Sequence, residues 1–460
     1  MLRSTRGQKK QKRSLKIFKI KMKKEKIVQK NNLSYIGLIL IAITFPLPFS
    51  ISNIFIVLAV LLWLIEGDFI NKFIRIKKQK TLWFIIGFYI LHVFSLVYTE
   101  NVSDGLFILE KKSVLLILPL IIASIALSES QIKNILYAFV LGNLLISIVL
   151  LSRVLFYFFI VKDCSTCFYH EFTSAVDLHA IYFSLFLLFS IYIIIFNLRT
   201  LNKVFASTAI AILSTSLIFA ASKTLLITFL VLLPLFLLLQ YRKALATFNK
   251  KIWLGITISL CACFISVIFL KPVKERFIDS FDTSSLKYLE IVGTNEQLTN
   301  DQKRELNGFT LRLLLAKLSL NKVFEDNAYF FGYGPADVSD QLNEVYLKHN
   351  MAPNWFFNYN THNQYIEVFL ELGIPGIIYL LSLLTIGFYY AYIHRNYLLA
   401  FFILLISVSF LTEVVLNRNK GIVFFTFFYS LFVFSNTILF GKKEESIYEN
   451  SNTRNERNSK

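Results

Sequence analysis

The sequence LLITFLVLLPLFLLL, residues 225–239, contains no charged side chain. Such a run is typical of the hydrocarbon core of a membrane, which a helix of about 20 apolar residues crosses. Residues 58–64 are also uncharged. Over the 460 residues of the chain, 55% are hydrophobic and 17% are charged, whereas soluble domains have about 25% charged residues. The composition excludes a soluble enzyme, a nucleic-acid-binding protein and a disordered chain.

Twelve apolar segments have roughly the length of a membrane-spanning helix. Their apolar runs are continuous rather than alternating, which favours helices over the strands of a β-barrel. We therefore expect an all-α, polytopic membrane protein with about twelve transmembrane helices. The segments are 34–50, 51–66, 81–98, 113–128, 132–157, 178–197, 204–221, 223–240, 251–270, 366–393, 397–415 and 421–440.

Positive charge is concentrated before the first apolar segment. The formal net charge is +19, and residues 1–33 hold thirteen of the 48 Lys and Arg residues. A basic cluster beside a membrane helix attracts anionic lipid and marks the cytoplasmic side. Membrane lipids, and not nucleic acid, are therefore the expected partners. Because an even number of spans returns the chain to the same side, both termini are expected in the cytoplasm.

One long polar segment, residues 271–361, interrupts the apolar pattern. Loops longer than about 15 residues are usually functional or disordered. Residues 309–324 place leucines near helical spacing, which predicts an amphipathic helix lying on the membrane. The expected organisation is a basic segment (1–33), helices one to nine (34–270), a structured loop on the outer face (271–361), helices ten to twelve (362–440) and a disordered tail (441–460).

Cys164 and Cys167 form a C-x-x-C motif in a predicted outer loop. A zinc site needs about four ligands, and only His170 stands close by in the sequence. A disulfide is the alternative, since the outer compartment can be oxidising. The spacing leaves both interpretations open, and it favours a disulfide over a metal site.

The start of the tenth apolar segment carries the most informative polar residues. Thr361 and Gln364 have the spacing of a capping box, which predicts the start of a helix. Asn363, Glu367 and Glu371 are four residues apart and share one face of that helix. Carboxylates at membrane depth are costly and usually face a polar cavity or a partner. Either a buried network that orients helices or a catalytic pocket would explain them.

Further polar side chains are expected on the same side of the membrane. Lys223 lies in a short turn between two apolar segments, and Arg312 lies among the leucines of the loop helix, where it could simply reach out to water. His179 and His362 each begin an apolar segment, where an imidazole can exchange a proton near neutral pH. Two cations and an imidazole suit an anionic, lipid-linked substrate better than a neutral solute.

These motifs together resemble the O-antigen ligase and polymerase superfamily of bacterial surface-polysaccharide enzymes. His362-Asn363, nine further residues, Gly373, two residues and Gly376 match the family's pattern. Three weaker pieces precede it: His179-Ala180-Ile181-Tyr182, Ser222-Lys223, and Arg312 followed by Gly332-Tyr333-Gly334-Pro335. Taken alone, the last glycine motif is either a plain turn or a backbone approach to phosphate.

The resemblance implies a glycosyltransferase of the bacterial inner membrane. Such an enzyme transfers a glycan from an undecaprenyl-diphosphate carrier to a lipid, glycan or protein acceptor, with inversion and with neither a metal nor another cofactor. It implies that His362 is the general base and that Arg312 and Lys223 bind the diphosphate. Supporting roles are implied for Asn363, Glu367, Glu371, His179, Tyr182, Gly332 and Gly334.

Two alternatives remain open. A polymerase that extends the lipid-linked chain would need the same donor site as a ligase. A lipid-linked oligosaccharide flippase or transporter would form no bond. That alternative predicts cations along a central path and no long outer loop, whereas here the cations are expected at the outer edge and the loop is long.

Overall fold

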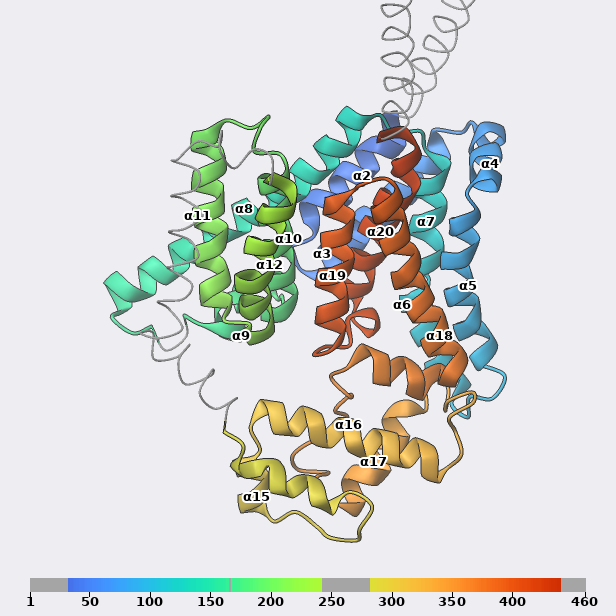
Figure 1. Cartoon of the computed structure of the whole chain (residues 1–460), viewed down its shortest axis with the longest axis vertical. Helices are drawn as coiled ribbons and strands as arrows, with labels where there is room; N and C mark the ends of the chain where they lie inside the picture. The colour runs from blue at the N-terminus through green and yellow to red at the C-terminus, as the bar shows by residue number, and fades with distance from the viewer. Residues whose placement is uncertain (1–31, 165–166, 242–281, 440–460) are drawn as a thin grey trace, which may run out of the picture.

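The computed structural model describes residues 32–164, 167–241 and 282–439, and its regular structure there is entirely helical (Figure 1). The expected span 251–270, most of the basic segment 1–33 and the tail 441–460 lie outside the described residues. The helices are α2 (Asn32–Thr44), α3 (Phe49–Ile65), α4 (Phe69–Lys78), α5 (Lys80–Ser95), α6 (Val102–Lys112), α7 (Val114–Ser124), α8 (Glu129–Phe156), η1 (Tyr157–Val161), α9 (Tyr169–Thr173), η2 (Ser174–Val176), α10 (Ala180–Phe196), α11 (Lys203–Ala220), α12 (Lys223–Tyr241), η3 (Ser284–Ile291), α15 (Asn300–Glu305), α16 (Gly308–Glu325), α17 (Val338–Lys348), α18 (Gln364–Ile393), α19 (Tyr397–Phe410), η4 (Val415–Asn417) and α20 (Asn419–Leu439).

The apolar helices are those of an integral membrane protein. Among the described residues, three are long and apolar enough to cross a membrane alone: α8 with η1, α11 and α18. Two bent pairs, α3 with α4 and α9–η2 with α10, would raise this number to five. Each expected segment within the described residues coincides with a helix, so the all-α class is confirmed. The number of twelve spans is not confirmed, because helices such as α2, with 13 residues, are short.

The centre of the bundle is filled by aromatic rings. The ring of Phe428, on α20, lies 4.9 Å from Phe139 on α8 and 4.9 Å from Phe189 on α10, centroid to centroid. Phe45, just after α2, lies 5.6 Å from the same ring. Edge-to-face and offset pairs of this kind add about 0.5–1.5 kcal/mol each beyond the burial of their area. These ring contacts pack α20 against α8 and α10, and they thereby position the start of α20.

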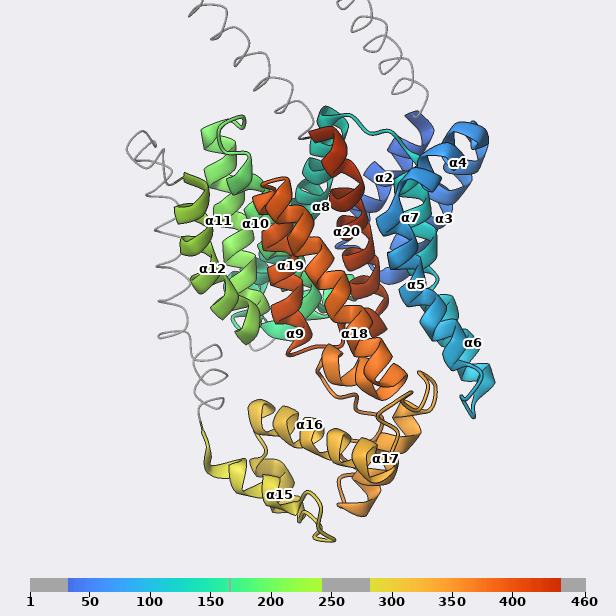
Figure 2. The same cartoon turned by 45° about the vertical axis from the view of Figure 1, so that its right-hand side comes forward.

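The chain reversals bring several helix ends to one end of the bundle. Helices α10, α12, α18 and α20 begin, and α11 and α19 end, at the lower end in Figures 1 and 2. The tight turn from α11 to α12 is made by Ala221, whose φ of 46° is left-handed. His179, Lys223, His362 and the connection from α19 to α20 therefore lie at the same end.

Residues 282–361, which we call the loop domain, form a helical layer below that end (Figure 1). The apolar face of α16 packs its own core there, with Leu314 and Leu315 fully buried beside Tyr346 of α17 and Leu370 of α18. The helix expected over 309–324 is thus confirmed. The leucines that predicted it cover the core of the loop domain, and its position on a membrane surface stays a prediction.

The loop domain is joined to α18 at a break in that helix. Gly373 has a φ of 62° and interrupts the helical backbone. The backbone N–H groups of Tyr333 and Gly334 donate to the carbonyl oxygens of Leu370, at 2.7 Å, and Glu371, at 3.1 Å. A Cβ atom on Gly332 would collide with the carbonyl oxygen of Leu370. The glycine motif therefore serves a close approach between two backbones.

Candidate active site

His362 is held in an uncommon backbone conformation at the start of α18. Its φ is 48°, in the left-handed region that costs a residue with a side chain about 1–2 kcal/mol. Its own N–H donates to Oδ1 of Asn360 at 2.9 Å. Strain of this kind persists only where the surroundings fix it, and it is found often at functional sites.

Asn363 is the residue that caps α18. Its Oδ1 accepts from the backbone N–H groups of Tyr365 and Ile366, at 3.0 and 3.2 Å. The capping box expected from Thr361 and Gln364 is therefore wrong. Asn363 lies nearer to the first turn, and a short amide side chain caps as well as Ser or Thr does.

Thr361 instead fixes the turn that contains His362 against the side of α18. Its hydroxyl and its N–H both donate to Oε2 of Glu367, at 2.7 and 3.2 Å. Nδ2 of Asn417, from the connection between α19 and α20, donates to the other oxygen of Glu367 at 3.2 Å. Glu367 is thereby hydrogen-bonded through both oxygens and holds two connections together.

Glu413 lies closest to the His362 ring among the described acidic residues. Its Oε2 is 3.8 Å from Nδ1 of His362, and the side chains are 6% and 27% exposed, respectively. At that distance the pair is in electrostatic contact but not hydrogen-bonded. Nδ1 of His362 is buried and has no hydrogen-bond partner among the described residues. Burial alone would raise the pKa of Glu413, but the neighbouring His362 and the backbone N–H of Val414 outweigh it and lower that pKa below the usual range of a carboxyl group. Glu413 is therefore ionised at neutral pH.

His179 and Tyr182, at the start of α10, belong to the same cluster. Their rings lie 5.9 Å apart, and both side chains interact electrostatically with Glu413 and Arg418. Desolvation and the neighbouring His170 lower the pKa of His179, so that this imidazole is neutral at neutral pH. The Tyr182 hydroxyl is buried without a hydrogen-bond partner in the described part of the chain. The structure thus brings together the beginnings of α10 and α18 and the connection before α20.

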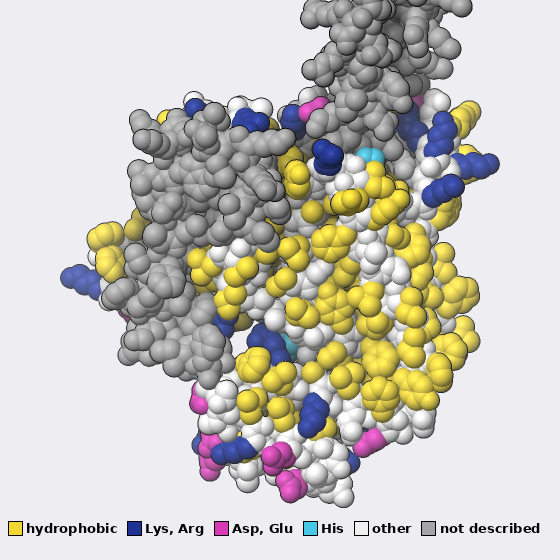
Figure 3. Space-filling view, in the orientation of Figure 1, with side chains coloured by type: hydrophobic (Ala, Val, Ile, Leu, Met, Phe, Trp, Pro, Cys, Tyr) yellow, Lys and Arg dark blue, Asp and Glu magenta, His cyan; other side chains and the backbone are white. Residues whose placement is uncertain are grey.

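The two expected diphosphate-binding cations come from two other elements. Lys223 is the first residue of α12, at the end of the bundle that faces the loop domain. Arg312 is in the second turn of α16, where Nη1 donates to the carbonyl oxygen of Gly308 at 3.2 Å. Its Nε is buried without a hydrogen-bond partner among the described residues. Figure 3 shows Lys or Arg side chains and a His side chain at a hollow where the apolar bundle meets the loop domain.

Glu371 belongs to a buried network one turn further along α18. Its Oε2 is 2.9 Å from Nζ of Lys112 and 3.3 Å from Nε2 of His92, and Asn417 donates to its Oε1 at 2.7 Å. Lys112 also donates to Oδ1 of Asn417 at 3.1 Å. All four side chains are buried or half-buried. The network ties α5, α6 and α18 to the connection before α20.

Cys164 and Cys167 are joined by a disulfide. This bond settles the alternatives that the C-x-x-C spacing left open. No group of three or more His, Cys, Asp or Glu that could hold a metal ion is found in the described ranges.

Comparison with known families bears on the same residues. Residues 208–381 match the family model described as O-Antigen ligase. Over this segment, the chain is similar to the O-antigen ligase family. The resemblance expected from the His362 motif is confirmed. No curated protein matches the chain.

The O-antigen ligase segment includes only part of the cluster. Lys223, Arg312 and His362 lie inside residues 208–381, whereas His179, Glu413 and Arg418 lie outside. Sequence reasoning did not single out Glu413 or the Lys112 network. A usable signal for Glu413 was present, because it is the one acidic residue between positions 397 and 440, and a lone carboxylate in an apolar stretch usually has a function.

Proposed function

We propose that this chain is a membrane glycosyltransferase that transfers a glycan from an undecaprenyl-diphosphate carrier to a lipid, glycan or protein acceptor. The match of residues 208–381 to the O-antigen ligase family model supports this class of reaction. One observation carries the assignment of residues. His362 is strained, its Nδ1 has no hydrogen-bond partner in the described residues, and that atom lies 3.8 Å from the buried carboxylate of Glu413.

In this mechanism His362 is the general base. Glu413 faces Nδ1, which leaves Nε2 for the hydroxyl group of the acceptor. As the acceptor oxygen bonds to the anomeric carbon, Nε2 takes the hydroxyl proton, and Glu413 stabilises the positive charge that develops on the ring. The bond from the anomeric carbon to the diphosphate oxygen breaks, and the diphosphate leaves with the electron pair. Attack opposite the leaving group inverts the anomeric carbon.

The leaving diphosphate needs positive charge. Arg312 is suited to it, since buried polar atoms normally have partners and its Nε has none among the described residues. Lys223 would add a point charge from the start of α12. Arg418, which interacts electrostatically with His179, is a third candidate. No step is assigned to a metal ion or another cofactor.

Supporting roles follow from the hydrogen bonds. Asn363 caps α18, and Glu367 fixes Thr361 beside the base. His179 and Tyr182 would line the acceptor side of His362. Glu371 would keep α18 in place through Lys112, and Gly332 and Gly334 would keep the loop domain docked on α18.

The membrane arrangement belongs to the same proposal. The site would lie at the periplasmic face of the bacterial inner membrane, with the loop domain outside and both termini in the cytoplasm. The shorter apolar helices would complete about twelve spans. Figure 3 is consistent with a membrane-embedded bundle, because hydrophobic side chains cover much of the visible face above the loop domain.

The test is to replace His362 and, separately, Arg312 with Ala in the native host. We expect loss of the surface polymer and accumulation of the carrier-linked glycan. Retained polymer in both variants would refute the mechanism. The accumulated species also separates two functions: a full-length chain indicates a ligase, and a single repeat unit indicates a polymerase.

A further inference from the structure

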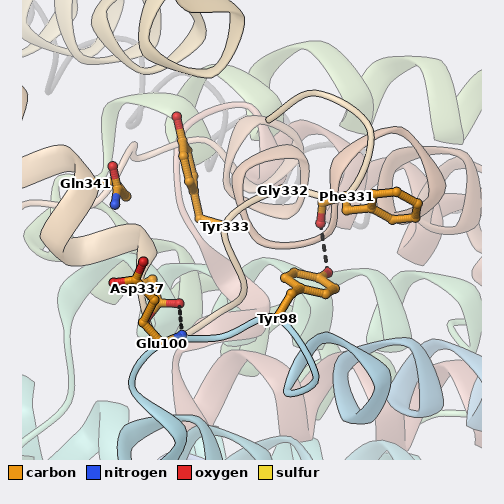
Figure 4. A pocket seen from close by; sticks show the side chains of 7 residues that line it. All are labelled: Tyr98, Glu100, Phe331, Gly332, Tyr333, Asp337 and Gln341. Atoms are coloured by element: carbon orange, nitrogen blue, oxygen red, sulfur yellow. Dashed lines mark hydrogen bonds between the residues drawn. The ribbon is translucent and has the colours of Figure 1, made fainter. Parts of the chain in front are cut away.

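A separate pocket lies between the loop domain and the connection from α5 to α6 (Figure 4). Its volume is about 290 Å³, near the lower limit for pockets that hold small molecules. Three chain segments form its wall: the connection before α6, the glycine motif Gly332-Tyr333-Gly334-Pro335 (the glycine turn) with the preceding Phe331, and the start of α17. The lining residues are Tyr98, Glu100, Phe331, Gly332, Tyr333, Asp337 and Gln341.

Hydrogen bonds between segments fix the shape of this pocket. The Tyr98 hydroxyl donates to the carbonyl oxygen of Phe331 at 2.7 Å. The Asp337 carboxylate accepts from the backbone N–H groups of Glu100 and Asn101, at 2.8 and 3.1 Å. Figure 4 shows the hydrogen bond between Tyr98 and Phe331 and the hydrogen bond between Asp337 and Glu100. The walls are therefore preorganised, which lowers the cost of binding a ligand.

Two polar side chains on the wall are free to bind. Among the described residues, no protein group forms a hydrogen bond with the side chains of Glu100 and Gln341. Glu100 is exposed and Gln341 is half-buried. A carboxylate offers acceptors and a primary amide offers both donors and acceptors, which is the complement that hydroxyl groups need.

The charge of the wall excludes a phosphate ligand. Its charged residues are Glu100 and Asp337, and the wall contains neither Lys nor Arg. Desolvation raises the pKa of Tyr98 to about 12 and, together with the hydrogen bond to Asp326, raises that of Tyr333. Both hydroxyls are therefore neutral. Aromatic rings beside carboxylate and amide groups, without a cation, suit an uncharged and hydroxyl-rich ring.

The pocket is one helical segment away from His362. The glycine turn hydrogen-bonds to the backbone of Leu370 and Glu371. These two residues lie near the far end of the helical segment 364–372, and His362 lies just before the start of that segment. Nine helical residues span roughly 13 Å. A glycan attached at the reaction centre could therefore reach the pocket with sugars a few units away.

We propose that the pocket formed by Tyr98, Glu100, Tyr333 and Gln341 is a glycan subsite that binds about one or two uncharged sugar rings of a substrate. This inference rests on the proposed function. It assigns recognition of the sugar chain to the junction of the loop domain with α5 and α6, apart from the cations that would bind the diphosphate.

The test measures binding of sugars that carry no diphosphate. Two probes are used with the full chain in lipid nanodiscs: the glycan released from the host's carrier lipid by mild acid, and the deacylated acceptor glycan. The double variant Glu100→Ala/Gln341→Ala is compared with a matched control, Glu290→Ala/Gln297→Ala. All four residues are exposed or half-buried, so folding should be retained.

We expect at least one probe to bind the pocket variant about tenfold more weakly, as the loss of one or two hydrogen bonds predicts. The same probe should bind the control variant like the unmodified chain. The probe that responds identifies the source of the sugar. Binding that is equal in the pocket variant, or absent from the unmodified chain, overturns the subsite. If transfer continues in that case, the proposed function stands. If the pocket binds glycan but no transfer occurs, the subsite stands and the proposed function fails.

Discussion

Replacing Glu413 with Gln removes one negative charge beside the proposed base and keeps the shape of the side chain. Two unit charges 3.8 Å apart attract each other by about 1 kcal/mol in water and about 4 kcal/mol at an effective dielectric constant of 20. The site lies between these limits, because the Glu413 side chain is 6% exposed and that of His362 is 27% exposed. If about 2–3 kcal/mol of this attraction acts in the transition state, kcat falls by about 30- to 160-fold.

The assay is transfer of glycan from the purified carrier-linked donor, with kcat and KM measured separately. We expect KM to stay near that of the unmodified protein, since the charge that Glu413 stabilises develops only as the proton moves. Glu413→Asp should recover part of the rate. Glu296→Gln, an exposed acid in the loop domain, serves as the control.

A structural role for Glu413 would give another result. Oε1 of Glu413 accepts from the N–H of Val414 at 3.3 Å, and a Gln side chain can accept in the same way. The thermal unfolding temperature should therefore change little. A kcat within twofold of the unmodified value, or a loss confined to KM, would refute the pairing of Glu413 with His362.

Three further predictions concern the supporting structure. Lys112→Met leaves Glu371 buried without a cation and should destabilise the protein by about 3–5 kcal/mol, measured by thermal unfolding in detergent. Adding Glu371→Gln should restore part of that loss, and no restoration would contradict the ion pair. Gly332→Ala should cost more than the ~1–2 kcal/mol of a left-handed residue, because its Cβ would also meet Leu370. Gly293→Ala, with a φ of 83° and open space, should cost only that amount, and equal losses would refute the close approach. Transfer by the purified protein should continue in excess chelator, and loss that Mg²⁺ or Mn²⁺ restores would refute a reaction without metal.

The helical segments could be predicted because their signal is local. Apolar runs such as 178–197 and 204–221 became α10 and α11 within a few residues of their expected ends. The leucine spacing of 309–324 gave α16 in the same way. The number of membrane spans could not be predicted so well, since breaks and bends, such as the 83° bend before α10, depend on packing between helices.

The partners of the site residues could not be predicted, because they come from distant parts of the sequence. Glu413 is 51 positions from His362, and Lys112 is 259 positions from Glu371. Nothing near either acid in the sequence indicates its partner. The motif around His362 predicted a general base, but the acid beside His362 lies on a different helix connection.

The buried network and the proposed active site depend on the same connection. Residues 411–418 carry Glu413, which faces His362, and Asn417, which hydrogen-bonds to Glu367 and Glu371. Because Lys112 also holds Asn417, the network determines where this connection lies and therefore how far Glu413 is from the base. The sequence offered a helix-orienting network and a catalytic pocket as alternative explanations for the carboxylates of α18. The hydrogen bonds support both, with Glu367 and Glu371 orienting the helices so that Glu413 can face the imidazole.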